Sequence, residues 1–187
     1  MILTLRPNAD GDLSELIPLG GGDHYVEVDD TGDGDGGSTY VVVMFEAEVY
    51  HEDLYHIPNH INEKGIIDEI RVYFRIKSAK SSEPGYAKAY IKTNSTEFAG
   101  WEQSESNGTW TLFYQEWARN PATTNPWTWV EIDALQIGVA LKANAEKSNP
   151  RCTQVWLEVY YQSAVRPKVG GSLAGNRLVG GGLAKCI

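Results

Sequence analysis

Hydrophobic and polar residues alternate along most of the middle of the chain, and a period of two is typical of β-strands. In residues 70–77, isoleucine, valine and phenylalanine occupy the even positions, whereas arginine, tyrosine and lysine occupy the odd ones. Such a segment has one face for a core and one face for solvent. The same reasoning predicts further strands at residues 3–5, 24–28, 40–50, 86–92, 109–117, 135–143 and 153–161.

Turn-forming residues separate several of these segments. The sequence Ser-Glu-Pro-Gly at 82–85 precedes the strand at 86–92, and Asn107-Gly108 precedes the strand at 109–117. Asn-Gly is a favoured dipeptide of two-residue hairpins. We therefore expect a hairpin turn at 107–108.

One segment has a helical pattern. Thr128 and Glu131 have the spacing of a capping box, in which each side chain satisfies a free backbone amide of the first helical turn. Apolar residues recur every three positions at Trp129, Ile132 and Leu135, and a glycine at position 138 marks a place where a helix can end. The pattern predicts one short helix at about 128–136.

These elements together predict an all-β fold, an antiparallel two-sheet sandwich of jelly-roll type with a single short helix. The predicted sandwich domain spans residues 1–163. A chain of 187 residues with 42% hydrophobic residues is long enough to bury a full core without disulfides or a structural metal.

Residues 164–187 have a different composition and are predicted to form a glycine-rich basic arm. They contain six glycines, four basic residues and no acidic residue, and a Val-Gly-Gly-x-Leu-Ala sequence at 169–174 recurs at 179–184. Such a segment cannot build a core of its own. We expect it to lie on the body of the protein or on a neighbouring copy.

Charge and apolar runs exclude several classes of protein. The formal charge is −9, which argues against a nucleic-acid-binding domain with a basic surface. The longest apolar run, residues 41–45, is far shorter than the roughly 20 residues of a membrane-spanning helix. The first residues lack the pattern of a secretory signal. Cys152 and Cys186 are too few for a disulfide scaffold, and Cys152 is expected to be a buried thiol.

The charge is also distributed unevenly, which bears on association. Residues 1–65 carry a net charge of −12, residues 66–163 carry −1, and residues 164–187 carry +4. Attraction between the basic arm of one copy and the acidic segment of another is therefore expected.

Two groups of residues are candidates for metal binding. Asp29, Asp30, Asp33 and Asp35 stand on a glycine-rich loop whose carboxylates suit Ca²⁺, although the EF-hand template does not match and a solvated turn is the alternative. His51, His56 and His60 stand near two acidic residues, but their spacing is not that of a common zinc motif. No other cofactor is indicated.

Sequence motifs do not favour catalysis. Glu116 and Glu131 are the best pair for glycoside hydrolysis by their aromatic context, but Glu131 is assigned to the capping box and Glu116 to an ordinary strand. Neither a nucleophile elbow, a P-loop nor a dinucleotide fingerprint is present. We expect a protein that is not an enzyme.

Aromatic residues are the main candidates for binding. The chain has six tryptophans and ten tyrosines, and alternation places Trp156 and Tyr160 on the face opposite Val155, Leu157 and Val159. Exposed rings on a sandwich bind either sugars or protein partners. The sequence leaves both alternatives open.

Two blocks of sequence resemble a recurring group of phage and viral proteins. The blocks are residues 127–139 (WTWVEIDALQIGV) and 151–159 (RCTQVWLEV), with weaker likeness at 5–8, in the Asp-rich loop and at 53–55. These relatives are mostly uncharacterised virion-associated proteins. The resemblance implies a structural protein of a virus particle, of the capsid-decoration, tail or fibre type, and it brings no catalytic residues.

The sequence therefore predicts a virion structural protein, made in the host cytoplasm, that self-associates as a homo-oligomer and contacts other virion proteins. The alternative is a carbohydrate-binding module for host attachment. Neither nucleic acid nor a membrane is an expected partner. The predicted subunit-contact residues all lie in the arm: Arg166, Lys168, Val169, Leu173, Arg177, Leu178, Val179 and Leu183.

Overall fold

The computed structural model describes residues 1–32, 37–44, 47–144 and 148–163, and these fold into two packed β-sheets. Sheet 1 consists of β10 (Thr111–Trp117), β6 (Gly65–Lys77), β12 (Arg151–Ser163), β4 (Val41–Val42) and β3 (Ile17–Pro18), with β1 (Ile2–Leu5) also paired to β12. Sheet 2 consists of β2 (Ala9–Ser14), β5 (Tyr50–His56), β11 (Gln136–Ala143), β7 (Gly85–Thr93) and β8 (Thr96–Ala99), with β9 (Gln103–Glu105) also paired to β7.

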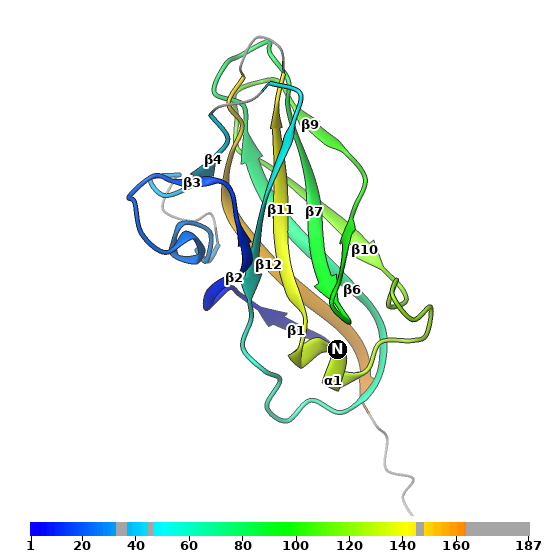
Figure 1. Cartoon of the computed structure of the whole chain (residues 1–187). Coiled ribbons are helices and arrows are strands. Elements are labelled where there is room, and N and C mark those ends of the chain that lie inside the picture. Colours follow the sequence, from blue (N-terminus) through cyan, green and yellow to red (C-terminus); the bar gives the residue numbers. More distant parts are fainter. Residues whose placement is uncertain (33–36, 45–46, 145–147, 164–187) are drawn as a thin grey trace, which may run out of the picture.

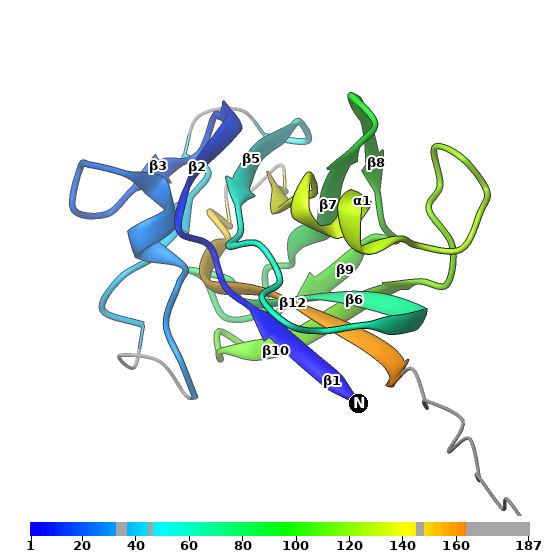
Figure 2. The ribbon, with the colours of Figure 1, turned by 90° about the horizontal axis from the view of Figure 1, so that it is seen from below.

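All pairings between these strands are antiparallel, and the two sheets form separate layers (Figures 1 and 2). In the view of Figure 2, β6, β10 and β12 belong to one layer, and β5, β7 and β8 belong to the other. The predicted fold class, an antiparallel two-sheet sandwich of jelly-roll type, is confirmed. In the part of the chain that the structure describes, no helix is both long and apolar enough to cross a membrane.

The core lies between the sheets and follows the alternation of the sequence. On β6 the even-numbered residues from Ile70 to Ile76 are fully buried, and the paired strand β12 contributes Val155, Leu157 and Val159. Residues of β11 face them from the other sheet. Full burial of such a side chain stabilises the fold by about 1.5–3 kcal/mol, so this double layer holds the sandwich together.

The predicted helix is present but shorter than expected. Helix α1 (Trp129–Asp133) begins after Thr128, and both hydrogen bonds of the capping box with Glu131 are formed. The helix ends at Asp133 instead of position 136, because Leu135 turns into the core and Gln136 starts β11, which pairs with β5 and β7. Figures 1 and 2 show α1 at one end of the sandwich.

Two of the predicted strands are wrong. Residues 24–27 form a 3-10 helix (His24–Glu27), because the Asp10 carboxylate accepts hydrogen bonds from two successive amides there and holds the chain in a turn. The segment 40–50 is not one strand: Val41–Val42 pair in sheet 1, whereas Tyr50 starts β5 in sheet 2. The chain crosses between the layers within this segment, so it cannot remain in one sheet.

The expected hairpin at 107–108 is also wrong. Gly108 has the positive φ of 68° that favours glycine, but the turn connects β9 in sheet 2 to β10 in sheet 1. The Glu105 carboxylate accepts hydrogen bonds from the amides of Asn107 and Thr109. Strand β10 then pairs with β6. The dipeptide correctly predicts a turn, but this turn connects strands of two different sheets.

The core position of α1 gives a stability prediction. Ile132 is 0% exposed, so Ile132→Asp places a carboxylate in the core without a partner. We expect the free energy of unfolding to fall by about 3–5 kcal/mol, measured by urea denaturation. Val130→Asp is the matched control, because Val130 belongs to the same helix and is 77% exposed; its effect is expected within about 0.5 kcal/mol. Equal effects of the two variants would contradict the assignment of this helix face.

Candidate functional site

The outer face of sheet 1 carries a row of stacked aromatic rings. Tyr73 and Trp156 stand on paired positions of β6 and β12, and their rings are parallel within 3° with centroids 4.9 Å apart. Tyr114 follows on the other side of Tyr73 at 5.2 Å. The spacing is close to that of neighbouring strands, about 4.8 Å, so rings on paired positions lie against one another.

Arginines cover further ring faces in this row. The Arg71 guanidinium lies 4.5 Å from the centre of the Tyr160 ring, and Arg6 lies 5.1 Å from that of Trp156. Trp156 and Tyr160 therefore lie outside the core, as the alternation of β12 predicts. Because the ring faces contact each other or a guanidinium, this surface presents mainly ring edges.

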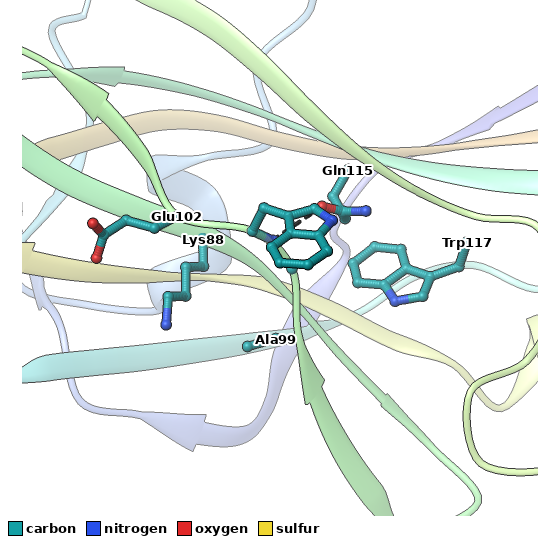
Figure 3. A pocket seen from close by; sticks show the side chains of 7 residues that line it. Lys88, Ala99, Glu102, Gln115 and Trp117 are labelled. Atoms are coloured by element: carbon teal, nitrogen blue, oxygen red, sulfur yellow. Dashed lines mark hydrogen bonds between the residues drawn. The ribbon is translucent and has the colours of Figure 1, made fainter.

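A groove of about 670 Å³ lies where the two sheets meet at an open edge. Its wall on the side of sheet 2 is the β8–β9 connection with Trp101, and its wall on the side of sheet 1 is β10 with Gln115 and Trp117. Lys88 of β7 and Glu102 complete the polar lining (Figure 3). Trp101 is 78% exposed, the highest value for an aromatic side chain among the described residues.

The backbone at Trp101 is fixed by its neighbours. The Gln115 side-chain oxygen accepts a hydrogen bond from the Trp101 amide at 3.0 Å, which Figure 3 marks with a dashed line. The preceding Gly100 donates to the Ala89 carbonyl at 2.8 Å. A Cβ at position 100 would lie 2.7 Å from the Gln115 side chain, so only glycine allows this close approach. The backbone that carries the exposed indole is therefore held on both sheets by hydrogen bonds.

A charged cluster centred on Tyr50 adjoins the groove on the outer face of sheet 2. The Tyr50 hydroxyl donates to the Glu102 carboxylate at 2.6 Å, and the Lys142 ammonium contacts the same carboxylate at 3.0 Å. These two contacts, the tyrosine hydrogen bond first, lower the pKa of Glu102. The ammonium groups of Lys88 and Lys142 lie 4.3 and 4.9 Å from the centre of the Tyr50 ring.

The groove thus combines an exposed indole face with a neutral amide, an ammonium group and a carboxylate. The Gln115 amide already accepts from the Trp101 amide and donates to the Glu116 carbonyl, and it keeps one further donor and one further acceptor site. The ammonium group supplies three donors, and the ionised carboxylate accepts. Such a set, on a mainly apolar wall, is typical of a small-molecule binding site. Sequence reasoning missed this site, because its residues come from three separate segments of the chain.

A second polar cluster is buried beneath β2 and has a structural role. The Asp53 carboxylate is fully buried and contacts the Leu16 amide at 2.9 Å, the His24 ring at 2.7 Å and the Tyr55 hydroxyl at 3.1 Å. Burial raises the pKa of Asp53. These contacts hold the 3-10 helix and the β2–β3 connection against β5.

The glycine-rich loop with the four candidate aspartates is described only in part. Asp29 and Asp30 belong to the described residues, whereas Asp33 and Asp35 lie outside them. The pKa of Asp29 is raised, first by burial and then by the neighbouring Asp30, and the Asp30 carbonyl accepts from the Gln154 amide at 3.3 Å. The proposed Ca²⁺ site stays a prediction.

The three candidate histidines do not come together at one site. His60 contacts Asp133 at 2.7 Å and His51 lies 4.0 Å from Glu15, while His56 is exposed at the end of β5. Among the described residues, no three His, Cys, Asp or Glu side chains form a group that holds a metal ion.

The two glutamates considered for catalysis have structural contacts. Glu116 lies 3.7 Å from Arg71 on the outer face of sheet 1. Glu131 completes the capping box and accepts a hydrogen bond from Asn120 at 2.9 Å. Neither of them lines the groove.

Of the two cysteines and the predicted contact residues of the arm, only Cys152 lies within the described residues. Cys152 is buried, as predicted, and burial raises the pKa of its thiol to about 12. Cys186 and the eight predicted subunit-contact residues of the arm, 166–183, lie outside the described residues.

Comparisons with known proteins give only distant structural similarities. No family model and no curated protein matches the chain. Among solved structures, the xylan-binding module CBM15 aligns with a TM-score of 0.45 and 11% identity over 88% of this chain and 99% of that one. The CBM22-1 xylan-binding domain from Paenibacillus barcinonensis Xyn10C gives 0.44 and 11% over 86% and 95%.

A third similar structure is the family 11 carbohydrate-binding module from Clostridium thermocellum in complex with a mixed-linked tetrasaccharide. Its TM-score is 0.40 at 12% identity, over 87% of this chain and 89% of that one. Similarities at this distance do not transfer a function to this chain.

The Tyr50 cluster gives a prediction that needs no ligand. Tyr50→Phe removes the strongest hydrogen bond to the Glu102 carboxylate, so we expect the pKa of Glu102 to rise toward its ordinary value. The shift is measured by NMR titration of the glutamate side chains. Tyr86→Phe is the control, since its ring contacts Lys142 at 4.5 Å and keeps that contact without the hydroxyl. An unchanged Glu102 pKa in Tyr50→Phe would contradict the contact.

Proposed function

We propose that the protein is a non-catalytic carbohydrate-binding domain and that the groove at Trp101 holds the sugar. The observation that carries the proposal is an exposed indole, on a backbone held by a hydrogen bond, beside an amide, an ammonium group and a carboxylate. The proposal corresponds to the alternative function drawn from the sequence.

The chemistry of a sugar fits this arrangement. A pyranose ring has a face of C–H groups, which packs on an indole, and a rim of hydroxyl groups, which exchange hydrogen bonds with amide, ammonium and carboxylate groups. A typical hydrogen bond adds only about 0.5–1.5 kcal/mol net in water. The aromatic contact is therefore expected to contribute at least as much to binding as any single hydrogen bond.

The groove is a better sugar site than the aromatic row of sheet 1. In that row Tyr73 stacks on Trp156, and arginines cover further ring faces. Sugar stacking there requires these contacts to be broken first. Trp101 has no ring contact with any described residue, so its face is accessible without such a cost.

Substitution of Trp101 tests the proposal. After a glycan array has identified ligands, Trp101→Ala is expected to weaken binding of the best ligand by about tenfold or more, equivalent to about 1.4 kcal/mol, measured by isothermal titration calorimetry. The melting temperature is expected to stay unchanged, because the side chain is exposed. Tyr114→Ala is the control: Tyr114 is 48% exposed but lies on the outer face of sheet 1. Equal losses in both variants would refute the assignment of the groove.

A second hypothesis is the self-associating virion structural protein indicated by the sequence. The observation that favours it is the pair of exposed apolar side chains Leu112 and Tyr114, which lie on the outer face of β10 in sheet 1, since exposed apolar surface is typical of protein contacts. In this hypothesis the arm supplies further contacts between copies.

Deletion of residues 164–187 tests this second hypothesis. We expect the full chain to be oligomeric and the truncated chain to be smaller, with the same melting temperature, because the core of the described residues is built from positions 5–161. Light scattering after gel filtration measures the mass of both at matched concentration. A full chain that stays monomeric at every concentration tested would exclude it.

A further inference from the structure

Three lysines project from the outer face of sheet 2, and two of them are neutralised. Lys92 contacts Asp12 at 2.9 Å and Glu97 at 3.4 Å. Lys142 contacts Glu102 at 3.0 Å. Their positive charges are therefore balanced within the protein.

Lys88 differs from the other two lysines. It lines the groove, its ammonium lies 4.3 Å from the centre of the Tyr50 ring, and no carboxylate of the described residues lies within 4.0 Å of it. The ring attracts the ammonium group and so restrains its position, but it brings no negative charge. Lys88 is thus a restrained cation that no described carboxylate contacts directly, although the charges of Glu102 and Glu52 act on it from further away.

The nearby carboxylates are already occupied. Glu102 accepts from Tyr50 and contacts Lys142. Glu52, whose charge also acts on Lys88, accepts a hydrogen bond from the Tyr90 hydroxyl. The two ammonium groups at the Tyr50 ring are therefore matched by the two carboxylates of Glu102 and Glu52, but only Lys142 contacts a carboxylate directly, so the Lys88 ammonium is the one left for direct contact with a ligand.

We propose that the groove prefers acidic sugars, with the Lys88 ammonium contacting the carboxylate of a uronic acid whose ring lies on Trp101. This inference rests on the proposed function and adds a substrate class to it. A compact ammonium group with three donors pairs with a carboxylate through a charge-assisted hydrogen bond. A sulfate ester offers the same charge and acceptor oxygens, so the test includes it as a separate arm.

The experiment compares matched ligands that differ only in charge. Oligogalacturonate and glucuronoxylan oligosaccharides are titrated beside their methyl esters, and a sulfated oligosaccharide is titrated beside its desulfated form. The salt concentration is 0.15 M, where the screening length is about 8 Å and the net charge of −9 repels acidic ligands only weakly. We expect the acid form of at least one uronic-acid ligand to bind about tenfold more tightly than its ester.

Two lysine variants assign this preference to one residue. Lys88→Gln is expected to remove the preference for the acid, so that the acid and its ester bind this variant with equal affinity. Lys92→Gln is the matched control, four residues away on the same face of β7, because its charge is already paired. It is expected to keep the preference.

The outcomes separate this inference from the proposed function. Equal binding of acid and ester, still lost in Trp101→Ala, would overturn the inference and leave carbohydrate binding intact. A preference for the acid that survives in Lys88→Gln would overturn the role of Lys88. Tight binding of the sulfated ligand alone would replace the uronic acid by a sulfate ester. If no saccharide of any charge bound, both the proposed carbohydrate binding and the preference for acidic sugars would be refuted.

Discussion

The pairing of β6 with β12 is the constraint on which the rest of the structure depends. Both strands are 13 residues long, and they pair in register over nearly all of that length, with bulges near each end of β12. Their inner side chains form one half of the core, whereas their outer side chains form the aromatic row. A slip of one residue would exchange the two faces. The register is therefore held by the cost of exposing the apolar face.

The sequence predicted the parts of the fold in which local pattern decides the structure. Strand β7 alternates throughout, β6 alternates over 70–77 and β12 over 155–161, and α1 has a complete capping box, so each is specified by residues close together in the chain. Strand β5 was missed, because Asp53 occupies a buried position in it. That carboxylate is tolerated only through hydrogen bonds from Leu16 and Tyr55 and a contact with His24, which the sequence of β5 does not reveal.

The candidate site was less predictable than the fold. The six tryptophans were recognised as a group, but nothing local distinguishes the exposed Trp101 from the buried Trp127. The difference depends on where the 100–102 connection meets β10, and that contact joins residues far apart in the sequence. The same limit applies to Asn107-Gly108, whose turn is local but whose change of sheet is not.

The hydrogen bond from the Trp101 amide to Gln115 joins a connection of sheet 2 to an edge strand of sheet 1. The width of the groove is therefore set by the distance between two sheets, and not by the shape of either one. A ligand that contacted both walls would link the two sheets at the open edge of the sandwich. Separation of the sheets would break those contacts, so a bound ligand would stabilise the sandwich at this edge.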